Sequence, residues 1–136
     1  MTGSLRQGGC GCGAVRYEIE GEPVVLAVCH CRECQRQSGS AFGMSLIVKK
    51  EAFRISGETR VYRRVADSGN PIDCHFCPTC GVRVFHDPQA LPGTYNVKAG
   101  TLDDTAWLAP AVQVWTKSRQ PWVTLPEGLA SVEGQP

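Results

Sequence analysis

The sequence predicts a mainly β protein, built as a single zinc domain of antiparallel sheets with little helix. Three observations predict this class. The 136 residues are the length of one domain, several short segments alternate apolar and polar side chains, and no window carries a sustained helical period. Eight cysteines accompany the expected strands. Because thiols stay reduced in the cytosol, this density of cysteines indicates metal binding more than disulfides.

Composition and charge argue against several classes of protein. Hydrophobic residues make up 42% of the chain and charged residues 20%, which is ordinary for a globular protein. The longest apolar run, residues 23–29, is too short to cross a bilayer. The first residues lack the apolar core of a secretory signal, which predicts a cytoplasmic protein. A formal charge of +1 without a lysine-rich run argues against nucleic-acid binding.

The first third of the chain leads into a dense group of cysteines. Residues 9–13 alternate glycine and cysteine, and glycine lets the backbone turn its N–H groups toward sulfur. Residues 14–20 alternate, which predicts a half-buried strand. Residues 24–28 are wholly apolar, which predicts a buried strand that ends at Cys29. Residues 35–40 are polar and predict one helical turn followed by a loop.

The rest of the chain is read as short strands joined by turns. Gly57 and Glu58 are expected to form a hairpin turn, and residues 67–71 form a loop by composition. We divide the chain into a lead-in over residues 1–8, a zinc domain over 9–125 and a loose tail over 126–136. The strands are expected at residues 42–48, 53–55, 59–65, 72–76, 82–86, 94–99 and 111–116.

One zinc-binding pattern lies in the middle of the chain. Two residues separate Cys77 from Cys80, and Gly81 follows, as in a zinc knuckle. Such a site needs two further ligands, and Cys10 and Cys12, also followed by a glycine, are the natural partners. Four thiolates around one ion make a closed tetrahedral site, which is the structural kind.

A second group of thiols comprises Cys29, Cys31 and Cys34. Three thiolates on one short segment can hold a soft metal and leave its fourth position exchangeable, as in catalytic zinc sites. Their negative charge weakens the ion as a Lewis acid toward water, which disfavours hydrolysis by a bound water. A substrate thiol entering the fourth position would instead lose its proton and become a nucleophile toward an electrophilic carbon.

The remaining cysteine and the histidines are weaker ligand candidates. Cys74 could replace a knuckle ligand, complete the second site, or pack as a small hydrophobic residue. His30 would point away from the neighbouring cysteines if its segment is extended. His75 and His86 stand in strand-like surroundings, so we interpret them as structural histidines with satisfied hydrogen bonds.

An anionic thiol substrate would need cations beside the second group. Arg32 and Arg36 flank it, and Ser38 and Ser40 could supply hydrogen-bond donors. An arginine can hold a carboxylate through two parallel hydrogen bonds. Further arginines on the expected strands are Arg16, Arg60, Arg63, Arg64 and Arg83.

The order and spacing of seven cysteines resemble the glutathione-dependent formaldehyde-activating enzyme family, which includes the domain of centromere protein V. The resemblance covers residues 9–122 and departs at Cys74, where many relatives carry an arginine. The segments that carry it are Cys10-Gly-Cys12-Gly13, Cys29-His-Cys31-Arg-Glu-Cys34 with Ser38-Gly39, Ser68-Gly69, and Phe76-Cys77-Pro-Thr-Cys80-Gly81.

The resemblance implies a β-tent fold with two zinc ions per chain. The implied reaction adds glutathione, as cosubstrate, to formaldehyde and gives S-hydroxymethylglutathione, which in reverse is a carbon–sulfur lyase reaction. The alternative is a non-catalytic zinc module that binds glutathione or a protein partner. The implied structural ligands are Cys10, Cys12, Cys77 and Cys80, and the implied catalytic ligands are Cys29, Cys31 and Cys34.

Overall fold

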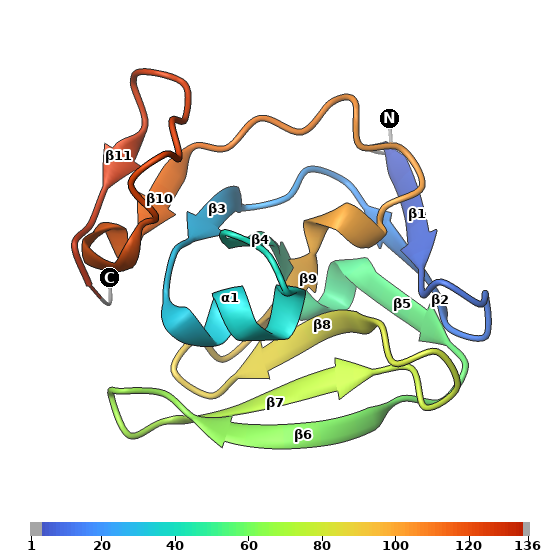
Figure 1. Ribbon diagram of the computed structural model, residues 1–136. Helices are drawn as coiled ribbons and strands as arrows, with labels where there is room; N and C mark the ends of the chain where they lie inside the picture. The colour runs from blue at the N-terminus through green and yellow to red at the C-terminus, as the bar shows by residue number, and fades with distance from the viewer. Residues whose placement is uncertain (1–3, 135–136) are drawn as a thin grey trace.

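The structure is a computed structural model that describes residues 4–134, and it is mainly β as predicted (Figure 1). A three-stranded sheet has the order β1–β2–β5, and an eight-stranded sheet has the order β11–β10–β3–β4–β9–β8–β7–β6. The smaller sheet contains β1 (Leu5–Gly9), β2 (Arg16–Glu20) and β5 (Phe53–Ser56). The larger sheet contains β3 (Val25–Cys29), β4 (Gly43–Lys49), β6 (Arg60–Val65), β7 (Pro71–Phe76), β8 (Arg83–Pro88), β9 (Thr94–Lys98), β10 (Val112–Val114) and β11 (Ala130–Ser131).

The helical segments are short. They are α1 (Arg32–Ser38) and the 3-10 turns η1 (Lys50–Ala52), η2 (Ala99–Thr101) and η3 (Thr116–Ser118). Within residues 4–134, no helix has the length and apolar character that crossing a bilayer requires.

The core lies between the two sheets. In β2, Tyr17 and Ile19 are almost fully buried, as the predicted alternation requires. The Phe53 ring of β5 lies 5.3 Å from Tyr17 and 5.0 Å from Phe85 of β8, measured between ring centroids. Phe53 therefore joins the small sheet to the large one, and aromatic pairs at these distances add to the apolar burial.

The predicted hairpin at Gly57 and Glu58 is wrong. β5 pairs with β2, whereas β6 pairs with β7. Gly57 has φ of 92°, and a Cβ added there would lie 2.1 Å from the carbonyl oxygen of Ala14. Only glycine fits this close crossing of the backbone. Gly57 therefore does mark a required turn of the backbone, but this turn leads from β5 of the small sheet to β6 of the large sheet.

Helix α1 begins earlier and is longer than the predicted single turn over residues 35–40. Cys31 is its N-cap, and the Sγ of Cys31 accepts a hydrogen bond of 3.2 Å from the backbone N–H of Cys34. Gly39 ends the helix in the left-handed conformation with φ of 60°. Because cysteine is not among the preferred N-cap residues, the sequence carried no start signal here.

Both ends of the described chain are tied into the sheets. β1 pairs with β2 along its whole length, and this strand was not expected. β10 pairs in parallel with β3 and with β11, so the larger sheet is not wholly antiparallel. The tail, expected to be loose, hydrogen-bonds back through Val132 N–H to Gln113 O at 3.0 Å. The parts of the expected lead-in and tail at residues 1–3 and 135–136 lie outside the described residues.

Candidate metal centres

The four-cysteine cluster, Cys10, Cys12, Cys77 and Cys80, joins the β1–β2 loop to the β7–β8 turn. The four Sγ atoms all lie within 4.8 Å of one another. The Sγ of Cys12 is 3.6 Å from that of Cys10 and 3.7 Å from that of Cys77. A tetrahedral ion with metal–sulfur bonds of about 2.3 Å separates its ligands by about 3.8 Å. These separations therefore suit a four-coordinate metal site.

Backbone amides support the sulfurs of this cluster. Val15 N–H donates to Cys10 Sγ at 3.3 Å, and Thr79 N–H donates to Cys77 Sγ at 3.3 Å. Burial acts to raise the pKa of Cys10, but the Val15 amide and the Cys12 thiol lower it to about 6. The loops thus favour the thiolate form of Cys10, which is the form that binds a metal.

The three-cysteine cluster, Cys29, Cys31 and Cys34, forms where β3 passes into α1. Its three Sγ atoms also lie within 4.8 Å of one another, and among residues 4–134 no histidine or carboxylate joins them. Cys29 is the last residue of β3, whereas Cys31 and Cys34 are three positions apart at the start of α1 and share one side of it.

One thiolate within this cluster is favoured by its neighbours. The thiols of Cys29 and Cys34 hydrogen-bond to Cys31 and lower its pKa, and the Cys31 thiolate in turn raises the pKa of Cys29. In this arrangement the thiol protons of Cys29 and Cys34 lie in hydrogen bonds to the Cys31 sulfur. A metal ion would replace those protons, so the donor set fits a soft divalent cation bound by three thiolates.

Positive charge faces the three-cysteine cluster from the large sheet. A Cβ added at Gly43 of β4 would lie 3.5 Å from Cys34 Sγ and 3.6 Å from Lys98 Nζ, so the two groups flank the same glycine. Burial lowers the pKa of Lys98, while the thiols of Cys34 and Cys29 act in the opposite direction. The charge of Arg64 also helps to lower the pKa of Cys31.

The histidines lie outside both clusters, as predicted. His30 is fully buried and its Nε2 hydrogen-bonds to Gln113 Oε1 at 2.9 Å. His75 stacks on Phe85 with a centroid distance of 4.2 Å. His86 is 3% exposed, and its Nε2 has no hydrogen-bond partner within residues 4–134, so the prediction that its hydrogen bonds are satisfied is wrong.

Cys74 also lies outside both clusters. It is fully buried in β7, and its Sγ lies 3.8 Å from the carbonyl oxygen of Ile72. Of the three interpretations of Cys74, packing in the sheet is the one that its position supports.

Two of the seven candidate arginines pair with carboxylates. Arg16 pairs with Asp103, and Arg63 pairs with Asp73 through hydrogen bonds of 2.6 and 3.1 Å. Ser38 does not face the cluster as a free donor, because its hydroxyl donates to Cys34 O at 2.8 Å.

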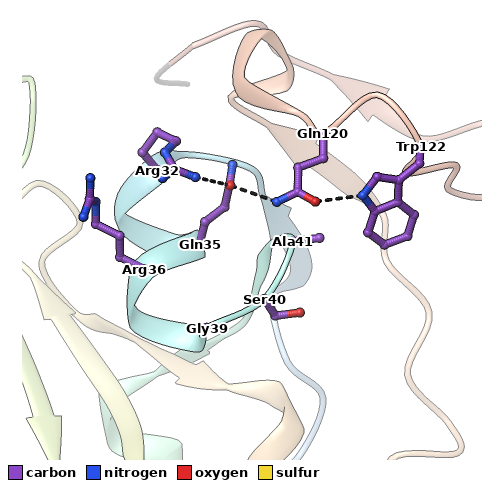
Figure 2. A pocket seen from close by; sticks show the side chains of 8 residues that line it. All are labelled: Arg32, Gln35, Arg36, Gly39, Ser40, Ala41, Gln120 and Trp122. Carbon is purple, nitrogen blue, oxygen red and sulfur yellow. Dashed lines mark hydrogen bonds between the residues drawn. The ribbon is translucent and has the colours of Figure 1, made fainter.

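A cleft of about 410 Å³ lies along α1, and Figure 2 shows the side chains that line it. The Oε1 of Gln35 accepts hydrogen bonds from Arg32 at 2.5 Å and from Gln120 at 3.1 Å. The indole N–H of Trp122 donates to Gln120 at 2.8 Å, and Trp122 is 72% exposed. None of the lining residues is a cysteine: they are Arg32, Gln35, Arg36, Gly39, Ser40, Ala41, Gln120 and Trp122.

Comparison with known proteins decides the family. A sequence profile of the family described as "Glutathione-dependent formaldehyde-activating enzyme" (GFA) matches residues 5–118. The protein belongs to the GFA family. A Halomonas elongata protein, provisionally named a glutathione-dependent formaldehyde-activating enzyme, is 24% identical over 127 residues, which cover 89% of this chain and 81% of that protein.

A solved structure shares the fold of this GFA chain. It is the crystal structure of a Rhodobacter sphaeroides protein, which matches with a TM-score of 0.58 and 22% identity. The match covers 76% of this chain and 91% of the other. At this identity the likeness shows the fold and carries no statement about activity.

Sequence reasoning missed two residues beside the three-cysteine cluster of this GFA protein. Lys98 ends β9, and Gly43 begins β4, and nothing local in the sequence marks either one. Their proximity to Cys34 follows from the pairing of β4 with β3 and β9. A register of this kind is not readable from single segments.

Proposed function

We propose that this GFA protein is a zinc-dependent carbon–sulfur lyase-type enzyme with small-molecule substrates, acting in the cytoplasm. In this proposal it activates the thiol of glutathione for addition to formaldehyde or a related electrophile, and it gives S-hydroxymethylglutathione-like adducts. The observation that carries the proposal is the three-cysteine cluster, whose three sulfurs lie within 4.8 Å and have no fourth ligand among residues 4–134. Such a site has a position for a substrate atom.

The proposal gives the two clusters different roles. The four-cysteine cluster would hold a structural zinc, because four thiolates fill the tetrahedral coordination of the ion. The three-cysteine cluster would hold the catalytic zinc, which when bound would accept the substrate thiol and favour its thiolate form. The closed site would therefore stabilise the fold, and the open one would serve the reaction.

The residues around the open site would orient the reactants and balance charge. Three thiolates and a substrate thiolate around one divalent ion carry a net charge of −2, which the positive charges of Lys98 and Arg64 offset. The thiol sulfur forms a bond to the carbonyl carbon, the C–O double bond becomes single, and the oxygen takes up one proton. Since the thiol releases one proton, the addition is balanced.

The test is turnover by zinc-loaded protein with glutathione and formaldehyde. We expect adduct formation and breakdown, followed by NMR exchange, to be faster than with glutathione alone. Cys31→Ser should reduce this acceleration at least about a hundredfold while the circular dichroism spectrum is unchanged. Ser56→Ala is the control, because Ser56 is exposed at the end of β5 in the small sheet, away from the three-cysteine cluster, and it should keep its activity. Wild-type protein that leaves the rate unchanged would contradict the proposal.

The second candidate function is a non-catalytic zinc module that binds glutathione or a protein partner. The cleft along α1 favours it, because the guanidinium groups of Arg32 and Arg36 and the exposed indole of Trp122 line a surface without cysteines (Figure 2). For this function, Arg36→Gln should weaken glutathione binding, Cys31→Ser should not, and no aldehyde should turn over. The enzyme proposal expects the reverse dependence on Cys31.

A further inference from the structure

A row of polar side chains crosses four neighbouring strands of the large sheet. Cys74 of β7 is the register partner of His86 of β8, which is the partner of Asn96 of β9. Partners in an antiparallel pair point to the same face. Arg64 lies on this face as well, because it is two positions along β6 from Tyr62, the partner of Cys74. We call Arg64, Cys74, His86 and Asn96 the polar row.

Three atoms of the polar row are buried without a hydrogen-bond partner within residues 4–134. They are Arg64 Nε, His86 Nε2 and Asn96 Oδ1. His86 is 3% exposed, so solvent does not replace the missing partner. A buried polar atom left unsatisfied costs about 1–3 kcal/mol. Three such atoms on one face of the sheet, from β6, β8 and β9, indicate a place where something polar binds.

The charges around the row are positive. Burial raises the pKa of Cys74, while Arg83, Arg64 and Lys98 act to lower it. His86 also lies within reach of these three cations, and burial together with their charge keeps its imidazole neutral. The acidic groups of the same strands are committed elsewhere: Asp73 pairs with Arg63, and Asp87 pairs with Lys50 at 3.2 Å.

The polar row runs up to the three-cysteine cluster. Lys98 lies two positions beyond Asn96 on β9, so both point to the same face. Lys98 Nζ is 3.4 Å from Ser45 Oγ and flanks Gly43 together with Cys34. Helix α1 lies beside this part of the sheet, and Arg83 of β8 donates to the Oε1 of Gln37 of α1 at 3.3 Å (Figure 1).

We propose that the polar row with Lys98 is a subsite for the carboxylate of a small substrate that reacts at the three-cysteine cluster. This inference rests on the proposed function and narrows its substrate class. A carboxylate would accept hydrogen bonds from Arg64 and Lys98, and a neighbouring hydroxyl would donate to Asn96 Oδ1. The adduct of a thiol with an aldehyde acid carries both groups. A carboxylate on the thiol is the other source of the same chemistry.

The test measures binding by titration calorimetry, so it does not depend on turnover. Zinc-loaded full-length protein is titrated with mercaptoacetate and with 2-mercaptoethanol, which differ in the acid on the thiol. It is then saturated with 2-mercaptoethanol and titrated with glyoxylate and with acetaldehyde, which differ in the acid on the carbonyl partner. In one of these two pairs of compounds, we expect the member that carries a carboxylate to bind at least about tenfold more tightly than the other. One charge-assisted hydrogen bond allows a difference of this size. The pair that shows the preference identifies the source.

Variants at two neighbouring arginines make the test specific. Arg64→Gln should abolish the preference for the acid without changing zinc content or 2-mercaptoethanol binding. Arg63→Gln is the matched control, because Arg63 is exposed and pairs with Asp73 on the other face. Arg64→Lys serves if the glutamine variant fails to fold, and it should keep a reduced preference because it keeps the charge.

Two results would overturn the inference: equal binding within both pairs, or a preference that survives in Arg64→Gln. Turnover of glutathione and formaldehyde by the same samples separates this inference from the proposed function. Turnover without an acid preference would refute the subsite alone. An acid preference without turnover of any thiol and aldehyde pair would refute the proposed reaction and leave the subsite.

Discussion

The two cysteine clusters use the same side chain in different surroundings. The four-cysteine cluster joins segments more than sixty positions apart, and its sulfurs accept hydrogen bonds from backbone amides such as those of Val15 and Thr79. The three-cysteine cluster comes from six consecutive residues, and charged side chains such as Lys98 face it. A cluster that crosslinks distant loops supports the fold, whereas one built within a single segment can exchange a ligand without separating the sheets.

The largest expected effect comes from removing one ligand of the four-cysteine cluster. Cys77→Ser should abolish cooperative thermal unfolding, because a thiolate-bound structural zinc contributes about 10–16 kcal/mol, comparable with the ~5–15 kcal/mol stability of a domain. Cys31→Ser, the matched variant in the three-cysteine cluster, should keep a cooperative unfolding transition and lose one zinc. Thermal melts with metal analysis measure both. The comparison between the clusters fails if the two variants melt alike.

Acid should release the metals of the two clusters at different pH values. Ligand thiols must be deprotonated, so zinc affinity falls as pH falls. Lowered thiol pKa values occur in both clusters, at Cys10 and Cys80 in one and at Cys31 in the other. The four-cysteine cluster differs by its fourth ligand, so more protons must bind before it releases its metal. The three-cysteine cluster should therefore release its zinc first. A colorimetric chelator followed from about pH 8 to about pH 4 should record two steps.

Assignment of the two steps uses the Cys31→Ser variant. The step at higher pH should be absent from it, and the step at lower pH should remain. A single step that releases both metals from wild-type protein would show that the clusters do not differ in this way.

The smallest expected effect comes from Gly43→Ala, which adds one carbon atom beside the three-cysteine cluster and leaves the four-cysteine cluster unchanged. A Cβ in Gly43→Ala would lie 3.2 Å from Cys34 Cβ, closer than an ordinary contact, and would displace Cys34. Overpacking of this kind costs about 1–3 kcal/mol, and we expect about tenfold weaker zinc binding at the open cluster. Gly100→Ala is the matched control, because an added Cβ there meets nothing within 4 Å. Competition with a chelator of known affinity measures both variants.

The sequence was a good guide where the signal is local. Alternation predicted β2, an apolar run predicted β3, and cysteine spacing predicted which sulfurs meet in each cluster. It failed where partners are set by the whole sheet. β5 and β6 adjoin in sequence but belong to different sheets, and a bulge between His75 and Phe76 shifts the register of β7 with β8.

The polar row was invisible to sequence reasoning for the same reason. Arg64 was one of several arginines on strands, and His86 and Asn96 carried no signal of their own. Only the successive pairing of β6 with β7, of β7 with β8 and of β8 with β9 places them on one face. Many weak side-chain preferences together determine the register of the strands. A shift of one residue would turn each of these groups to the other face.

The measurement that tests the central claim most directly is a thiol titration of cobalt-substituted protein, because the visible bands of cobalt report its coordination and the arrival of a new sulfur ligand. We predict two cobalt ions per chain, one of which changes its spectrum on addition of glutathione while the other does not. In Cys31→Ser the responsive half should be lost. If neither ion responds to glutathione, mercaptoacetate or 2-mercaptoethanol, the three-cysteine cluster is not an open thiol-binding site, and the account is wrong.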